Sequence, residues 1–373
     1  IDPDPLPPSI TYHVEGYAEL GAFDHNSTLT VFPLDKSLAH IEEQAYGGKV
    51  ETDYGLFSAS GNMKFQESLY FEVQVTGNFF NGTKGRRSEH KTTLRAINHV
   101  INHADEERSI NRYIKLPATN VNIFTQLTAA RICTLLKKAA GYNEMSHTIT
   151  DIYRNASEQA LKEVLTAFSI SDIYVSMLSI DPTRASFSQY NAPASMMAAV
   201  SNILLTSVDE ELLDTFFTEW DKDFAPDGRI DNEDIKESIR DGQQSLKYTN
   251  VYKQLDSFYK AYDFKSDFPE FWKFVDRNGD GILDKQDKPD DFEITEEELT
   301  PSQQQCIQLL EQVNKYLRDF LQTECVWEAN FCGAIGPIPD YPTTLVPTDS
   351  EVYEIWTAAY ATCLLYTSPS PRD

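Results

Sequence analysis

The chain has 373 residues, of which 41% are hydrophobic, so it is long enough to bury more than one core. Its 58 Asp and Glu residues outnumber its 32 Lys and Arg residues, which gives a formal net charge of −26 at pH 7. A surface of this sign repels phosphate backbones and anionic lipids, so the composition argues against binding to nucleic acid or to an anionic membrane surface. Calcium and neutral ligands such as glycans remain compatible with it. No apolar run reaches the ~18–20 residues that a transmembrane helix needs.

The N-terminal part predicts a tether followed by strands. Residues 1–9 (IDPDPLPPS) are acidic and rich in proline, so we expect an extended tether there and expect any signal peptide to have been removed. From Ile10 to about residue 100, apolar and polar residues alternate between turn sequences such as YGG, SGN and FNGT. Short strands with no helical period between them predict an antiparallel β-sandwich over residues 10–100.

After the strands, apolar residues recur at steps of three and four, which is typical of amphipathic helices. Segments 120–139 and 155–168 have this spacing, and the more uniformly apolar segment 194–205 predicts a buried helix. We therefore expect a helical domain over residues 101–206. The order of elements along the chain, with the strands first and the helices afterwards, predicts a multidomain α+β protein.

Two helix starts are predicted further along the chain. Ser207 and Glu210 have the spacing of a capping box ahead of an amphipathic helix. Segment 300–321 begins with the capping residue Thr300, followed by proline and a long apolar stripe. We expect this last helix to open a further domain over residues 296–362.

The C-terminal end resembles a sequencing artefact. Residues 363–373 (CLLYTSPSPRD) resemble, at every position, the conceptual translation of a transposase sequencing adapter. We therefore expect the natural sequence to differ after about Thr362 and the domain begun at residue 296 to be cut short there. Of the five cysteines, Cys325 and Cys332 are close enough in sequence to bridge in an oxidising compartment, but spacing alone does not establish a disulfide.

The strongest motif is DRNGDGILDKQD at residues 276–287, which has the ligand spacing of an EF-hand calcium loop. Side-chain oxygens at loop positions 1, 3, 5, 9 and 12 and a backbone carbonyl at position 7 would surround one ion, and glycine at position 6 allows the sharp turn. Position 12 is an aspartate, one methylene shorter than the usual glutamate, which predicts weaker affinity. A vacant Asx-rich turn is the alternative, although its carboxylates would repel one another. The expected ligands are Asp276, Asn278, Asp280, Ile282 (carbonyl), Asp284 and Asp287.

A second acidic loop, WDKDFAPDGRIDNED, repeats this spacing with an insertion. If Phe224–Pro226 replace a single residue, the ligand positions of a calcium loop are restored. Ile230 and Leu283 then occupy the same loop position and would face each other across a short β-bridge, which predicts an EF-hand-like pair within residues 207–295. A degenerate partner loop that binds no metal is the alternative. The expected ligands of this weaker loop are Asp221, Asp223, Asp227, Arg229 (carbonyl), Asp231 and Asp234.

Other candidate sites have weaker support. His99 and His103 are spaced to hold zinc on a helix, but no third ligand is evident, and a polar surface turn is the preferred interpretation. Carboxylate pairs for glycoside hydrolysis are unavoidable among 58 acidic residues, and the sequence singles none out. The chain has no G-x-S-x-G, P-loop or G-x-G-x-x-G motif. We therefore expect no catalytic residues and no enzyme.

Several segments resemble known families. GYAELGAFDHNSTLTVFPLD and ETDYGLFSAS resemble the transthyretin-like, carboxypeptidase-regulatory-type sandwiches of secreted proteins, and the continuation through NVNIFTQLTAARI is similar to bacterial lipoproteins with such a sandwich and a helical follower. In those proteins the sandwich is an accessory module, so the resemblance implies no catalytic residues here. The acidic loops resemble EF-hand and dockerin loops. SEVYEIWTAAYAT looks like the early helix of SusD-like nutrient-binding lipoproteins.

These features predict an extracytoplasmic calcium-binding protein, secreted or anchored at the cell surface as a lipoprotein, in which calcium is structural and the role is binding or assembly. Glycans or other outer-membrane proteins are the expected partners besides calcium. The alternative is the non-catalytic N-terminal part of a secreted hydrolase, and a calcium sensor comes third. A sensor opens a methionine-rich groove when it binds calcium, whereas Met196 and Met197 precede both loops and no methionine follows them.

Overall fold

The structure is a computed structural model that describes residues 10–63, 69–100, 113–144, 149–171, 173–176, 179–189, 191–262 and 270–290. These residues all belong to a first unit, residues 1–293, and residues 294–373 make up a second unit. Several predictions lie outside the described residues: the tether 1–9, the helix 300–321, the cysteine pair, the SusD-like segment and the C-terminal segment 363–373.

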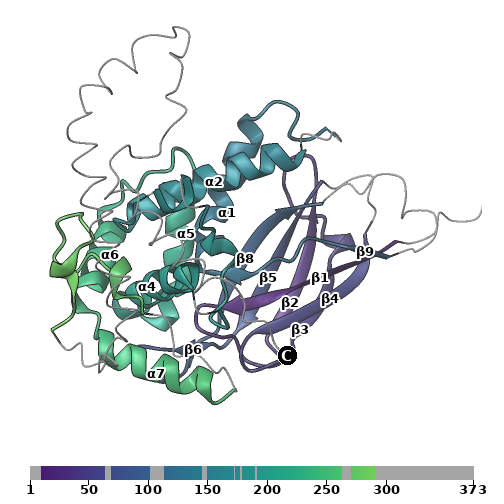
Figure 1. The fold of residues 1–373 in the computed structure, drawn as a ribbon. Coiled ribbons are helices and arrows are strands. Elements are labelled where there is room, and N and C mark those ends of the chain that lie inside the picture. Colours follow the sequence, from purple (N-terminus) through teal and green to yellow (C-terminus); the bar gives the residue numbers. More distant parts are fainter. Residues whose placement is uncertain are drawn as a thin grey trace, which may run out of the picture. The chain divides into compact units, whose positions relative to one another are not determined.

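The N-terminal strands form one curled sheet that resembles half of a barrel (Figure 1), with the strand order β10-β1-β4-β3-β2-β5-β8. Its long antiparallel strands are β1 (Ile10–Glu19), β2 (Thr28–Leu34), β3 (Tyr46–Val50), β4 (Leu56–Met63), β5 (Tyr70–Gly77) and β8 (Thr92–His99). Two short later strands, β9 (Tyr113–Lys115) and β10 (Val121–Asn122), run parallel to β1 along its other edge. β6 (Phe80–Asn81) and β7 (Arg86–Arg87) pair with each other as a separate hairpin.

The alternating sequence pattern explains the strands. Along β2, Leu29 and Val31 are fully buried whereas Thr28 is exposed, as expected when side chains point alternately to the two faces of a sheet. The segment 49–60, which reads as one strand, is divided by a turn between β3 and β4. Gly55 lies in this turn at φ +89°, where a side chain would meet the carbonyl oxygen of Ala18.

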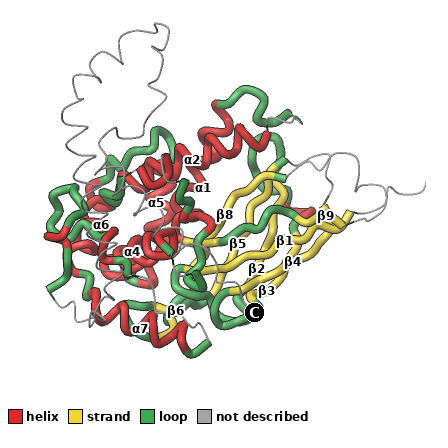
Figure 2. The backbone as a smooth tube through the Cα atoms, in the orientation of Figure 1, coloured by secondary structure: helices red, strands yellow, loops and turns green. Residues whose placement is uncertain are grey.

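Apart from the β6–β7 hairpin, the described strands lie in one sheet, so the expected two-sheet sandwich is not confirmed. Helices α1 (Ile123–Lys138) and α2 (Ile149–Ala167) cover this sheet (Figure 2). Apolar side chains of α1 and α2 supply the burial that a second sheet would provide in a sandwich. The shared core contains Leu34, Tyr70, Ile97, Ala129, Ile132, Leu136, Ile149, Ala156 and Ala160.

The remaining helices follow in the predicted order of strands first and helices afterwards, so the mixed α and β composition is confirmed. They are α3 (Ile173–Ser176), α4 (Ala192–Ser207), α5 (Leu213–Phe224), α6 (Glu233–Ser245) and α7 (Tyr248–Lys260). α4 is buried along most of its length, as its apolar sequence predicts. In the described part of the chain, no helix combines the length and the apolar character needed to span a bilayer.

The start of α1 is held by Asn122. The Asn122 Oδ1 accepts hydrogen bonds from the backbone N–H groups of Phe124 (3.0 Å) and Thr125 (3.1 Å), which satisfies donors that the first helical turn leaves open. Its Nδ2 donates to the carbonyls of Pro182 (3.1 Å), Thr183 (3.2 Å) and Ala185 (3.3 Å). One buried side chain therefore caps α1 and fixes the segment 182–185 beside it.

Candidate functional site

The loop at residues 276–287 is organised by its first aspartate. Asp276 is 3% exposed, and its two carboxylate oxygens accept hydrogen bonds from the backbone N–H groups of Gly279 (2.9 Å) and Gly281 (3.0 Å). Gly281 has φ +80° at the loop position where the predicted turn needs glycine. The sharp turn expected from the sequence is therefore present.

Asp287 closes the other end of the loop. It is 1% exposed, and its Oδ1 accepts from the N–H groups of Arg277 (2.8 Å) and Asn278 (3.2 Å). Its Oδ2 accepts from the N–H of Asp284 at 3.0 Å. The buried carboxylate of Asp287 thus links the end of the loop to the backbone at its beginning.

The predicted ligands in the middle of the loop are exposed and bond locally. The side-chain oxygens of Asn278, Asp280 and Asp284 each accept the N–H of the second residue along the chain, at 2.9, 2.8 and 2.7 Å. Across the described residues, no three or more Asp, Glu, His or Cys side chains are grouped so that they could hold a metal ion. The structure therefore forms the loop and buries its two end carboxylates, but does not gather all the predicted ligands around one point.

The segments that flank this loop differ from those of an EF-hand. In place of the helix that enters an EF-hand loop, the described residues 270–275 contain the short 3₁₀ turn Trp272–Phe274 followed by extended Val275. Phe274, Val275 and Asp276 are buried one after another, which an amphipathic helix with one apolar face does not allow. No β-bridge among the described residues joins Ile230 to Leu283. The EF-hand pair is therefore not confirmed.

The weaker loop places its predicted ligands in separate interactions. Asp221 lies within α5, and its Oδ2 forms an ion pair with Arg95 Nη2 at 2.5 Å. The Oδ2 of Asp223 accepts from the N–H groups of Asp231 (2.9 Å) and Asn232 (3.1 Å). The remaining predicted ligands are exposed: Asp227, Arg229, Asp231 and Asp234.

Arg95 connects the buried Glu72 carboxylate to the half-buried Asp221 carboxylate, a network that the sequence analysis did not find. Its guanidinium lies between Asp221 on α5 and Glu72 on β5, with Nη1 3.5 Å from Glu72. Glu72 is 3% exposed and also contacts His40 Nε2 at 3.1 Å. Burial alone would raise the pKa of Glu72, but His40 and Arg95 outweigh it and lower that pKa. A glutamate within the apolar run YFEVQV is the signal that could have indicated a buried partner.

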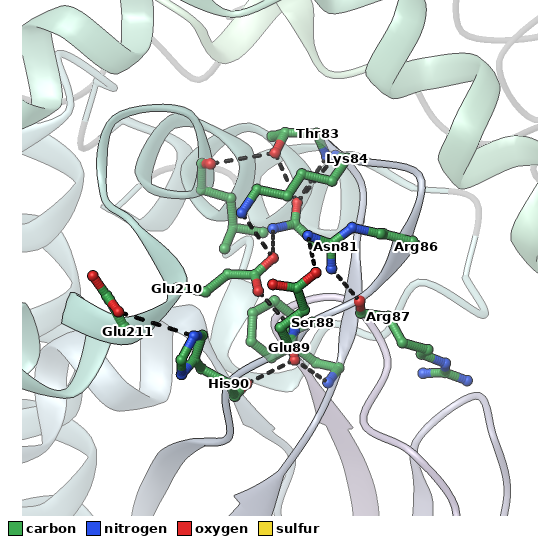
Figure 3. A network of polar contacts seen from close by, with 12 residues as sticks. Asn81, Thr83, Lys84, Arg86, Arg87, Ser88, Glu89, His90, Glu210 and Glu211 are labelled. Atoms are coloured by element: carbon green, nitrogen blue, oxygen red, sulfur yellow. Dashed lines mark hydrogen bonds and ion pairs between the residues drawn. The ribbon is translucent and has the colours of Figure 1, made fainter.

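Glu210 does not form the predicted capping box. Ser207 is the last residue of α4, and the Glu210 carboxylate instead accepts from Asn81 Nδ2 (2.7 Å) and from the N–H of Glu89 (2.8 Å). Lys84 Nζ lies 3.2 Å from the same carboxylate, as Figure 3 shows. Burial would raise the pKa of Glu210, but these partners lower it overall. The network attaches the β6–β7 hairpin to the segment before α5.

Two further titratable groups are buried. Glu19 at the end of β1 is 1% exposed, and burial raises its pKa to about 8. His99 at the end of β8 is 7% exposed, so the expected surface turn is wrong for this residue; His103 lies outside the described residues. Burial and the charge of Arg184 lower the pKa of His99 to about 4. Neither the Glu19 carboxylate nor the His99 imidazole belongs to either of the two acidic loops.

Comparisons with known proteins do not assign the chain to a family. No protein-family model, no curated protein and no solved structure matches it.

Proposed function

We propose that the chain is a non-enzymatic, extracytoplasmic calcium-binding protein, a surface lipoprotein with a binding or assembly role whose fold is stabilised by calcium at residues 276–287. The observation that carries this proposal is the pair of buried carboxylates at the two ends of the loop. Asp276 and Asp287 are 3% and 1% exposed and are oriented by backbone N–H groups. Two like charges held in this way favour a bound cation.

The donor chemistry suits calcium. The predicted ligands present only oxygen atoms, and calcium accepts irregular arrangements of six to eight oxygens. Asn278, Asp280 and Asp284 are exposed, so their side chains can rotate toward an ion without disturbing the core. Magnesium requires a stricter octahedral arrangement and releases its water reluctantly.

Calcium would act as a structural ion. With a Kd on the order of 10⁻⁵ M and external calcium near 1 mM, occupancy would stabilise the folded state by about 2.7 kcal/mol. The second loop would contribute less, because Arg95 already supplies a positive charge to Asp221. Phe271 and Phe274, just before the loop at residues 276–287, are buried. This burial supports a structural role for calcium, because it ties the loop to the core.

Thermal unfolding and calorimetric titration test this proposal. Calcium should raise the Tm of the protein, and an equal concentration of magnesium should not. Asp280→Ala with Asp284→Ala should abolish most of the calcium-dependent shift, while leaving the Tm in chelator little changed because both side chains are exposed.

Asp209→Ala with Asp241→Ala is the matched control, since it removes the same charge at exposed positions outside the loop. Equal Tm shifts with calcium and magnesium, or a full calcium shift in the loop variant, would contradict the proposal.

A further inference from the structure

A cavity of about 480 Å³ with both polar and apolar lining residues lies between the end of β8, helices α1 and α2, and the segment 179–184. This volume falls in the range of small-molecule sites. Hydrogen bonds fix its walls: Tyr153 Oη on α2 donates to the Ile97 carbonyl at 2.6 Å, and Asn120 Nδ2 donates to the Arg184 carbonyl at 2.8 Å. The cavity is therefore bounded by groups that are already held in place.

The hydrogen bonds around His99 determine which ring nitrogen carries its proton. Asn98 Nδ2 donates to Thr119 Oγ1 at 3.0 Å, and that hydroxyl donates to the Pro117 carbonyl at 2.8 Å. Asn98 Oδ1 is consequently an acceptor, and it receives the backbone N–H of His99 at 2.8 Å. The same oxygen lies 3.1 Å from His99 Nδ1, so Nδ1 must carry the hydrogen.

The other ring nitrogen is left as an unused acceptor. His99 Nε2 is buried and has no hydrogen-bond partner among the described residues. The residue as a whole is 7% exposed and lines the cavity. The ring stacks on Tyr153 with the centroids 4.7 Å apart, which holds its orientation. A low pKa keeps the imidazole neutral at pH 7. A buried acceptor without a donor is costly, and a ligand hydroxyl or N–H group would satisfy it.

The charged groups of the lining favour an uncharged ligand. The charged lining residues are Arg154, Glu158, Asp181 and Arg184, so two positive and two negative charges balance. Arg184 also pairs with Asp181 at 3.3 Å. Threonine and serine hydroxyls, which both donate and accept, supply much of the remaining polar lining. A net charge of −26 also disfavours anions.

We propose that this cavity binds a small neutral polyhydroxylated molecule of monosaccharide size, one hydroxyl of which donates to His99 Nε2. The inference gives a site to the binding role proposed above and does not depend on the calcium loop.

Ligand-observed NMR tests the site with D-glucose, D-galactose and D-mannose as neutral probes and D-glucuronate as the charged comparison. At least one neutral sugar should receive saturation from the wild-type protein, and glucuronate should bind more weakly. His99→Phe keeps an aromatic ring but removes the acceptor, so its affinity should fall about 10-fold. His90→Phe is the control, because His90 is exposed and outside the lining.

A second variant guards against misfolding of the first. Ala118 is exposed and lines the cavity, so Ala118→Trp should obstruct binding without disturbing the core. In the free wild-type protein, ¹⁵N spectra should show His99 protonated at Nδ1 and bare at Nε2. The site is refuted if none of the three neutral sugars binds, if His99→Phe binds as tightly as wild type while folded, or if Nε2 carries the proton. Titration in chelator separates this test from the calcium proposal, since sugar binding should persist when the calcium-dependent Tm shift is absent.

Discussion

Glu19 differs from the other buried glutamates in the kind of partner it has. Its carboxylate accepts from the N–H of Phe187 (3.1 and 3.2 Å) and lies 3.5 Å from Tyr259 Oη. Glu72 and Glu210, in contrast, each lie within 3.5 Å of an Arg or Lys nitrogen. Burial therefore raises the pKa of Glu19, whereas the pKa values of Glu72 and Glu210 are lowered.

The raised pKa of Glu19 predicts a loss of stability as the pH rises. Its ordinary pKa is 4.5 and its folded-state pKa is about 8, so the folded state binds the proton more tightly than the unfolded state between these values. The contribution of protonated Glu19 to the free energy of unfolding is complete below pH 4.5. It is lost as the pH rises through 8, by up to about 1.4 kcal/mol per pH unit. Glu19→Gln, which stays neutral, should remove this decline in urea unfolding at pH 5, 6.5 and 8.

Glu211→Gln is the matched control, because Glu211 is exposed. It should keep the wild-type dependence of the free energy of unfolding on pH. An unchanged slope in Glu19→Gln would show that Glu19 is ionised in the folded protein.

Arg95 predicts a large effect of a single substitution. Arg95→Met would leave the buried Glu72 and the half-buried Asp221 without their shared cation. Breaking a fully buried pair costs about 3–5 kcal/mol, so for this partly exposed arginine we expect a loss of about 3 kcal/mol. Arg154→Met removes an exposed ion pair and should cost less than about 1 kcal/mol. Urea unfolding in chelator measures both losses. Similar values for the two variants would contradict the role given to Arg95.

The spacing of residues in the sequence predicted features that depend only on neighbouring residues, and it did not predict contacts between distant parts of the chain. The turn at Gly281 follows from the order of residues within the loop at 276–287. The partner of Asp221 does not, since Arg95 is 126 residues away in sequence. Long-range pairs of this kind also explain why the capping box was wrong: Glu210 bonds to Asn81, 129 residues earlier.

Among the secondary-structure elements, the start of α1 is held more firmly than the start of α4. Asn122 caps α1 and also donates to three carbonyls of segment 182–185, whereas Asn191 caps α4 through a bond from Ala194 N at 3.0 Å. Asn122→Ala should therefore lower the free energy of unfolding by about 2–4 kcal/mol. Asn191→Ala should cost about 0.5–2 kcal/mol. Equal losses in chemical unfolding would mean that the bonds to segment 182–185 add nothing.

Helices α1 and α2 were predictable as elements because each has a continuous apolar face, within segments 120–139 and 155–168. The arrangement of the strands was not predictable in the same way. Alternation shows which side chains share a face, but does not show whether the opposite layer is a second sheet or a helix. Here α1 takes that place, with Ala129, Ile132 and Leu136 in the core it shares with Ile97.

At the scale of the whole molecule, the calcium proposal predicts a local response. In hydrogen exchange, removal of calcium should reduce protection at residues 270–290 and, to a lesser degree, at 215–235, because the end carboxylates would repel one another without the ion. Residues 10–63 and 69–100 should keep their protection, since the core that the sheet shares with α1 and α2 contains no residue of the loop. A chelator that exposes a new apolar surface on a folded protein would instead identify calcium as a switch.

The burial of Glu19 also has a consequence for the order of events during synthesis. Its hydrogen-bond partners Phe187 and Tyr259 lie 168 and 240 residues further along the chain. The ribosome therefore completes strand β1 long before it makes the segments that enclose the end of that strand. We expect the nascent chain to expose apolar surface over this interval and to fold slowly, because contacts so distant in sequence require long loops to close. Nascent chains that end before residue 259 should consequently remain dependent on chaperones, and this dependence should fall in longer chains once α7 has left the ribosome.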